Sequence, residues 1–187
     1  ARDLAGKANM ALAVAELTGW SADAFTIERE ASGRPVVLGP TAAPEISITH
    51  REGLALAVAG HGGLLGIDRE QVEARPASFG STWLTLGERA LAAGDPRRET
   101  AIWAAKEAVL KALGLGMALD PRQVEVLALL PRPARLRLHG EAAERAAALG
   151  GRLCVGLAHE PCAVVATALI FGGSLPREAC QERTRSA

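Results

Sequence analysis

The sequence contains no tyrosine and few other aromatic residues, namely three phenylalanines and three tryptophans among 187 residues. A surface on which the bases of single-stranded nucleic acid stack needs several exposed rings, so this composition argues against one. Basic and acidic residues balance at 21 each. The balance also argues against a nucleic-acid or anionic-membrane surface built on bulk charge. A local basic pocket for a small anion is compatible with both observations.

The chain also lacks an even set of cysteines and any long apolar run. Cys154, Cys162 and Cys180 have no metal-ligand spacing. We therefore interpret them as reduced thiols of a cytoplasmic protein, with Cys154 and Cys162 in the core. No apolar run reaches membrane-spanning length and no signal peptide is visible. We expect neither a membrane nor a nucleic-acid partner.

A chain of this length suffices for one domain or for two small packed lobes. It should bury roughly 70% of its unfolded surface, so a core of Leu, Val, Ile and Ala needs no disulfide or structural metal. The sequence begins with Ala1 rather than Met and enters a helical pattern at once. We therefore expect a processed chain or a domain of a longer protein.

The clearest helix signals surround residues 102–114. Asp95 is a favourable N-cap, Pro96 fits the first helical position, and Gly114 supplies a left-handed C-terminal position. Apolar residues recur between them at helical spacing and predict a buried stripe. Glu107 and Lys111 lie four residues apart on another face. Taken alone, such a pair is typical of a solvated helix surface.

Periodicity and turn residues predict the other elements. A capping box at Thr85 and Glu88 opens a helix that ends near Gly94. Residues 71–84 are expected to be a loop, and the tail from about residue 172 is expected to be flexible. Further helices are expected over residues 2–18 and 141–149, and strands over residues 24–30, 36–38, 46–49, 54–59, 64–68, 124–129, 134–138, 153–158 and 163–170.

Residues 46–59 and 155–168 form a weak internal repeat. Each segment reads as a strand, a turn that opens with histidine, and a second strand of small residues. An Arg-Pro turn and a short strand precede each of them. The repeat predicts two related lobes, residues 1–61 and 62–187. The alternative is that hairpins rich in alanine and valine resemble one another by chance.

Three carboxylates suggest a metal site. Asp68 and Glu70 are two residues apart at the end of a predicted strand and therefore point the same way, and Glu107 follows on the central helix. Carboxylates without nearby His or Cys are hard ligands that suit Mg²⁺ or Mn²⁺ rather than Zn²⁺. Mg²⁺ held by few carboxylates completes its shell with water and phosphate oxygens, so the pattern indicates phosphate chemistry. As a bare pattern, two acids two residues apart usually mark a solvated surface.

Two segments match one family signature in register. They are Gly66-Ile67-Asp68-x-Glu70 and Trp103-x-x-Lys106-Glu107-Ala108-x-x-Lys111. Together they resemble the 4'-phosphopantetheinyl transferases, whose pattern is a hydrophobic-Gly-Ile/Val-Asp strand followed by Trp/Phe-x-x-Lys-Glu-Ala/Ser-x-x-Lys. Gly33-Arg34-Pro35 is similar to the family's Gly-Lys-Pro turn, residues 46–50 are similar to its Ser-His strand end, and the helix start at Thr85 also fits. The resemblance covers most of residues 1–170.

The resemblance implies a fold and a reaction. The fold is α+β, a pseudo-dimer of two similar lobes, each a small antiparallel sheet packed on a long helix. The reaction moves 4'-phosphopantetheine from coenzyme A to a serine of an apo acyl or peptidyl carrier protein and releases 3',5'-ADP. Such carriers serve fatty-acid, polyketide or nonribosomal peptide synthesis. Length, the internal repeat and the Asp-x-Glu pair favour the longer, monomeric type that is exemplified by the enzyme that activates surfactin synthetase, rather than the short trimeric type.

The family's site residues can be carried over to matching positions. Asp68, Glu70 and Glu107 would hold Mg²⁺, or Mn²⁺ in its place, against the coenzyme A pyrophosphate. Glu107 would also accept the proton of the carrier serine, and Lys111 would contact the pyrophosphate, which makes Asp68, Glu107 and Lys111 the catalytic set. Trp103 and Lys106 are interpreted as packing and structural partners. The coenzyme A pocket would comprise Arg2, Arg34, Pro35, Thr49, His50 and Lys111.

Five features depart from the family pattern. Arg34 stands where lysine is usual and keeps the charge, and Thr49 stands where serine is usual and keeps the hydroxyl. Arg51, directly after the histidine, is less usual. A first strand is expected before residue 1, and the gap between the two motifs is short. An integrated domain of a polyketide or fatty-acid synthase would explain the start of the chain.

Two other functions fit parts of the pattern. One is a catalytically silent module of the same fold that binds carrier protein or coenzyme A. The presence of all three carboxylates and Lys111 speaks against it. The other is a magnesium-dependent phosphohydrolase. It would need a residue that positions water, and none is identifiable in the sequence.

Overall fold

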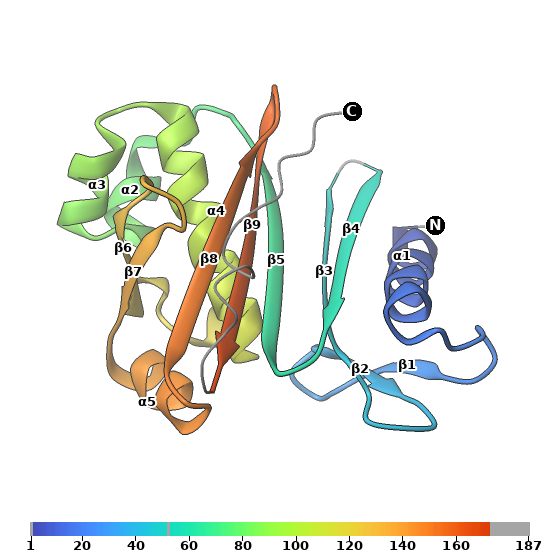
Figure 1. Cartoon of the computed structure of the whole chain (residues 1–187). Helices are drawn as coiled ribbons and strands as arrows, with labels where there is room; N and C mark the ends of the chain where they lie inside the picture. The colour runs from blue at the N-terminus through green and yellow to red at the C-terminus, as the bar shows by residue number, and fades with distance from the viewer. Residues whose placement is uncertain (1, 52, 173–187) are drawn as a thin grey trace.

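The computed structural model describes residues 2–51 and 53–172, with side chains from residue 6 onward. It is an α+β fold of helices on small antiparallel sheets, as the sequence predicts (Figure 1). Cys180 and nearly all of the predicted tail lie outside the described residues, as does the side chain of Arg2. In the part that is described, no helix combines the length and apolar character needed to cross a membrane.

The N-terminal part is a helix followed by two hairpins. Helix α1 packs on the hairpin formed by β3 and β4, and β1 pairs with β2 in a separate antiparallel hairpin (Figure 1). Met10 and Val14 of α1 are buried in a small core with Phe25, Val37 and Ile46. The elements are α1 (Arg2–Thr18), β1 (Thr26–Arg29), β2 (Pro35–Leu38), β3 (Glu45–Arg51) and β4 (Leu54–Gly60).

The C-terminal part is built on a three-stranded antiparallel sheet of order β5-β9-β8. Helix α4 packs along β5 and β9, and the main core lies between them. The elements are β5 (Gly63–Gln71), α2 (Ala77–Trp83), α3 (Leu86–Ala92), α4 (Pro96–Leu113), η1 (Gly116–Ala118), η2 (Pro121–Gln123), β6 (Val124–Ala128), β7 (Arg135–Leu138), α5 (Gly140–Ala148), β8 (Arg152–His159) and β9 (Ala163–Phe171). The series of a helix, a short hairpin and a longer hairpin therefore occurs twice in the chain.

Helix α4 has the ends that its sequence predicts. The Asp95 carboxylate accepts hydrogen bonds from the amides of Arg97 and Arg98, and Pro96 occupies the first turn. Gly114 closes the helix in the left-handed conformation at φ 72°. From residue 100 to residue 113, every side chain of α4 is buried except those of Glu107 and Lys111. The two candidate catalytic residues of this helix are thus the ones that the core leaves accessible.

Three expectations about local structure are wrong. Residues 71–84 are not all loop, because α2 forms there and places Phe79 and Trp83 against Trp103, with ring centroids 5.1 and 5.9 Å apart. These tertiary contacts stabilise a helix whose small residues show no clear period. Strand β5 continues to Gln71 because β9 pairs with its whole length, so Asp68 lies inside the strand. The third error concerns cysteines: Cys162 is exposed in the β8–β9 turn and Cys154 is only half-buried.

A close contact between β5 and α4 sets the position of the carboxylates. A Cβ atom on Gly66 would lie 1.8 Å from the backbone oxygen of Ala108. Only a residue without a side chain allows the strand and the helix to approach this far. Asp68 lies two residues further along the same strand and therefore faces the same way as Gly66, toward α4.

Strands β3 and β5 lie side by side without belonging to one sheet (Figure 1). Buried hydroxyl groups connect them instead. The Ser47 hydroxyl accepts a hydrogen bond from the Ile67 amide at 3.1 Å, and the Thr49 hydroxyl accepts one from the Arg69 amide at 3.3 Å. This seam joins the N-terminal and C-terminal parts of the fold and brings β3 next to Asp68.

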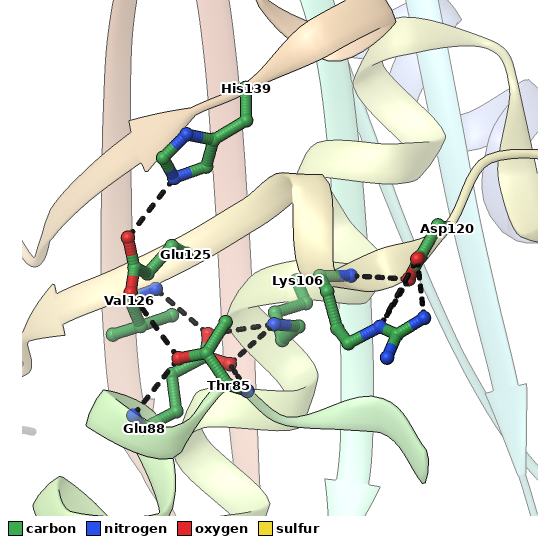
Figure 2. A network of polar contacts seen from close by, with 8 residues as sticks. Thr85, Glu88, Lys106, Asp120, Glu125, Val126 and His139 are labelled. Atoms are coloured by element: carbon green, nitrogen blue, oxygen red, sulfur yellow. Dashed lines mark hydrogen bonds and ion pairs between the residues drawn. The ribbon is translucent and has the colours of Figure 1, made fainter.

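A buried ion pair fixes α4 from its other side, as Figure 2 shows. The Lys106 ammonium donates to both carboxylate oxygens of Glu88, each at 2.7 Å. Glu88 also accepts the amides of Val126 and Thr85, and it completes the predicted capping box of α3. Glu125 extends the network by accepting the Thr85 hydroxyl at 3.3 Å and contacting His139 at 3.0 Å. Lys106 is thus a structural partner, as its position off the Glu107 face suggests.

Candidate active site

A cleft of about 470 Å³ lies at the seam between the two parts of the fold. Strands β3 and β5, the turn before β2, and the C-terminal end of α4 form its walls. Its charged lining is mainly basic, with Asp68 and Glu70 as the acidic side chains. A cleft of this composition favours a ligand with several negative charges. The basic side chains that line it are Arg29, Arg34, His50, Arg51, Arg69 and Lys111.

Lys111 and Asp68 form the centre of this cleft. The Lys111 ammonium lies 2.8 Å from Asp68 Oδ1 and also donates to the Ile67 carbonyl at 3.0 Å. The Thr49 hydroxyl donates to the same Asp68 oxygen at 3.3 Å. The second carboxylate oxygen, Oδ2, is buried and has no hydrogen-bond partner among the described residues. An unpaired buried carboxylate oxygen is costly, so Asp68 has an unused position for a cation or a donor.

Glu70 lies beside this centre but is held by two arginines. Its Oε2 atom lies 2.5 Å from Arg51 Nη1 and 2.9 Å from Arg75 Nη2. Arg51 comes from β3, whereas Arg75 follows β5 and places its guanidinium over the Phe79 ring at 4.4 Å. Glu70 therefore serves here as the counter-ion of two guanidinium groups, one from each part of the fold.

Glu107 is half-buried on α4, one helical turn before Lys111, and is not among the residues that line the cleft. Burial raises the pKa of its carboxyl group, and the negative charges of Asp68 and Glu70 raise the pKa further, while Lys111 and Arg75 oppose this effect. The three predicted metal ligands are therefore close enough to interact electrostatically. A carboxylate with a raised pKa is poised either to accept a proton or to gain from a nearby cation.

The fit of these residues to a divalent cation is partial. Asp68 and Glu107 fit, because Asp68 has a buried unpaired oxygen and Glu107 has a carboxylate that lacks full charge compensation. Glu70 could bind the cation through Oε2 only if Arg51 or Arg75 left that oxygen. Within the described residues, no group of three His, Cys, Asp or Glu side chains has the spacing to hold a metal ion.

Most of the predicted coenzyme A residues come together in the cleft. Arg34, Pro35, Thr49 and His50 all line it. Arg34 forms an ion pair with Glu45, and its guanidinium also reaches the end of α4 near Gly114. His50 is exposed, whereas the Thr49 hydroxyl is buried and already bonded to Asp68. The Arg2 side chain, also predicted for this pocket, lies outside the described residues.

Sequence reasoning missed Ser47, Arg69 and Arg75. Ser47 belongs to the seam, and its alternation with Thr49 on β3 was a usable signal because both residues face β5. Arg69 lines the cleft and pairs with Glu160 at 2.8 Å. Arg75 lies within residues 71–84, the segment that is expected to be a loop, and no spacing rule links it to Glu70.

A family model matches the part of the chain that holds these carboxylates and Lys111. The model of the 4'-phosphopantetheinyl transferase superfamily matches residues 64–165, more than half of the chain. The matched residues include Asp68, Glu70, Glu107 and Lys111. A search of curated proteins gave no match.

Several solved structures are similar in fold. The Plasmodium yoelii acyl carrier protein synthase with ADP bound has a TM-score of 0.53 at 22% identity, covering 61% of this chain and 98% of that one. The acyl carrier protein synthase–coenzyme A complex of Chronobacterium ammoniagenes has a TM-score of 0.50 at 22% identity, covering 61% and 100%. The Helicobacter pylori holo-[acyl-carrier-protein] synthase in complex with coenzyme A has a TM-score of 0.50 at 19% identity, covering 57% of this chain and 99% of that one. With the motifs in place and more than half of its length matched, this chain belongs to the 4'-phosphopantetheinyl transferase superfamily.

Proposed function

We propose that this protein transfers 4'-phosphopantetheine from coenzyme A to a serine of an apo acyl or peptidyl carrier protein and releases 3',5'-ADP. The observation that carries the proposal is the Lys111–Asp68 contact of 2.8 Å in a mainly basic cleft, with Glu107 one turn away on the same helix. Two solved structures that share the fold are complexes with coenzyme A, which agrees with such a ligand.

The basic residues of the cleft would bind the phosphates of coenzyme A. Arg34 and His50 line the wall formed by β3 and the turn before β2, and Pro35 shapes that turn. Lys111 would contact the pyrophosphate from the opposite wall. The Thr49 hydroxyl would hold Asp68, and through it Lys111, next to β3. Thr49 could donate to a phosphate only by giving up its present hydrogen bond to the Asp68 carboxylate. Arg2 remains a candidate for the rim of this pocket.

In the reaction, the serine oxygen of the carrier forms a bond to the phosphorus of the phosphopantetheine group, and the bond from that phosphorus to 3',5'-ADP breaks. Glu107 would accept the serine proton, a role that suits a carboxylate whose pKa is raised by burial and by Asp68. Lys111 would stabilise the negative charge of the leaving group. Asp68 holds the Lys111 ammonium in place for this contact.

Asp68 and Glu107 would hold Mg²⁺ or Mn²⁺, and Glu70 is the candidate for a third ligand. The bound ion would neutralise charge that builds on the leaving phosphate of 3',5'-ADP. The unpaired Oδ2 of Asp68 and the raised pKa of Glu107 support this assignment.

The chain would be of the longer, pseudo-dimeric type. The matched synthases are covered almost entirely, while the family model leaves residues 2–63 of this chain unmatched. Those residues form the helix and two hairpins that precede β5, in the order that α4 and the later hairpins repeat. We therefore propose lobes over residues 1–61 and 62–187, in a monomer located in the cytoplasm. An integrated domain of a polyketide, fatty-acid or nonribosomal peptide synthase is a variant of the same proposal.

One observation favours a second function, a catalytically silent module that binds coenzyme A or carrier protein. As arranged among the described residues, the carboxylates do not form a metal-binding group. One experiment separates the two functions. The protein is incubated with coenzyme A, Mg²⁺ and several apo carrier proteins, and each carrier is weighed by mass spectrometry. A gain of one phosphopantetheine group supports the transferase. Binding of coenzyme A without any gain in carrier mass supports the silent module.

A further inference from the structure

The basic side chains of the cleft are not all equally able to bind a ligand, because most already have a carboxylate partner. Lys111 pairs with Asp68, Arg34 with Glu45, and Arg69 with Glu160. A phosphorylated ligand must compete with these carboxylates. The cation that exchanges most readily is the one whose partner loses least when the pair opens.

Arg51 meets this condition. Its Nη1 lies 2.5 Å from Glu70 and its Nη2 lies 3.0 Å from Glu73. Glu70 keeps a second guanidinium, that of Arg75, at 2.9 Å after Arg51 leaves. Glu73 is 47% exposed, so water solvates its carboxylate at little cost. Neither partner of Arg51 would become a buried, uncompensated charge.

In the part of the chain that the structure describes, the Lys111–Asp68 pair has no second cation of the kind that Arg75 provides for Glu70. Within residues 2–51 and 53–172, Asp68 has no second cation beside Lys111, and Asp68 is only 4% exposed. Moving Lys111 away from Asp68 would therefore leave a buried carboxylate without a counter-ion. Among the cleft cations with a carboxylate partner described here, Arg51 also has the most accessible side chain, at 36% exposure, compared with 29% for Lys111.

Arg75, in contrast, is held in its present position next to Glu70. Its side chain is only 11% exposed and its guanidinium packs on the Phe79 ring. Stacking on an aromatic face and pairing with Glu70 both favour one fixed position. Arg75 does not line the cleft, whereas Arg51 does, next to His50 at the end of β3.

We propose that Arg51 is a phosphate-binding residue of the cleft that exchanges Glu70 for a ligand phosphate while Arg75 keeps Glu70 neutralised. Guanidinium groups bind phosphate oxygens in a bidentate manner, which makes the exchange favourable for a dianionic group. Glu70 then acts as an internal competitor for the ligand. This inference rests on the proposed function, because it takes the ligand to be coenzyme A.

The test is a titration of the whole chain with coenzyme A and with 3',5'-ADP by calorimetry, in EDTA so that no metal contributes. Arg51→Gln should weaken binding by roughly 10- to 100-fold, the usual effect of losing a hydrogen bond to a charged group. Glu70→Gln should tighten binding several-fold by removing the competitor. The gain from Glu70→Gln should vanish when Arg51→Gln is also present. Arg122→Gln, which changes an exposed arginine that pairs with Asp120 away from the cleft, is the charge-matched control.

The outcomes separate this inference from the proposed function. Failure of the unaltered protein to bind coenzyme A under any condition overturns the proposed function and this inference with it. Binding by the unaltered protein with equal affinity in Arg51→Gln overturns this inference alone. A gain from Glu70→Gln that persists without Arg51 also overturns it, because a general effect of charge would then be the cause. Circular dichroism of each variant verifies that the fold is intact.

Discussion

The Lys106 ammonium lies 2.7 Å from both carboxylate oxygens of Glu88, and neither side chain is exposed. This pair joins α3 to α4 immediately before Glu107 in the sequence. A buried ion pair stabilises a protein little compared with a well-packed apolar pair, but the loss of one member leaves the other charge without compensation. The pair therefore holds the register of α4 while making the fold sensitive to a single substitution.

Lys106→Met should destabilise the protein by about 3–5 kcal/mol, because Glu88 would remain buried without its counter-ion. The double variant Lys106→Met/Glu88→Gln should recover a large part of this loss. The glutamine oxygen can still accept the Val126 amide that Glu88 now binds. Urea unfolding followed by circular dichroism measures both free energies. Equal stability of the single and double variants would contradict this account of the pair.

A second prediction concerns the contact between β5 and α4. Gly66→Ala should destabilise the protein by about 1–3 kcal/mol or more, because its Cβ would lie 1.8 Å from the Ala108 oxygen and 2.8 Å from the Ala112 amide nitrogen. The matched control is Gly87→Ala on α3. The nearest atom to a Cβ at that position lies 3.6 Å away. This control should be neutral or stabilising by up to about 1 kcal/mol, since alanine favours a helix. The melting temperatures of the two variants test this prediction. A Gly66→Ala variant as stable as the unaltered protein would show that α4 can shift away from β5 without cost.

The sequence was sufficient to predict the elements that depend on local signals. The capping box at Thr85 and the caps at Asp95 and Gly114 are local chemistry, and all three are present in the structure. Helix α2 was missed because Phe79 and Trp83 are stabilised by contact with Trp103, about 20 residues later in the chain. Pattern reasoning has no access to such a contact.

The site shows the same division. The family motif led to Asp68, Glu70 and Lys111, which line the cleft, and to Glu107, which lies outside its lining. The Lys111–Asp68 contact joins the two segments of the motif. The charge partners were not predictable, because Arg51 and Arg75 reach Glu70 from different parts of the fold. No periodicity links these three positions. Their pairing depends on the seam between β3 and β5, which Ser47 and Thr49 build through side-chain hydrogen bonds.

A third prediction uses the raised pKa of Glu107. A carboxyl group whose pKa is higher in the folded chain than in the unfolded chain binds its proton more tightly when folded, so its ionisation costs stability. This cost is absent below the ordinary pKa of 4.5 and is fully present above the folded-state value. In EDTA, Glu107→Gln should therefore raise the melting temperature relative to the unaltered protein at pH 8 but not at pH 4.

Addition of Mg²⁺ provides the second half of this experiment. The ion should raise the melting temperature of the unaltered protein at pH 8 and have a smaller effect on Glu107→Gln, because the variant lacks one proposed ligand. Glu99→Gln is the control, since Glu99 lies in the first turn of the same helix, away from Asp68. If Glu107→Gln lowers the melting temperature at every pH, the carboxylate has a structural role and not the proposed one.

The last prediction concerns His50, which is exposed at the end of β3 and lines the cleft. His50→Ala should weaken the binding of coenzyme A by roughly 10-fold or more, because a hydrogen bond to a charged phosphate contributes about 1.5–3 kcal/mol. The fold should be unaffected, since the side chain is solvated. His61→Ala, an exposed histidine in the turn between β4 and β5, is the matched control and should leave binding unchanged.

Calorimetry with coenzyme A and with its dephosphorylated analogue, which lacks the 3'-phosphate, locates the contact. If His50 holds that phosphate, the substitution weakens coenzyme A but leaves the affinity for the analogue nearly unchanged. An equal loss for both ligands would assign His50 to another part of the molecule, and no loss for either would remove it from the site.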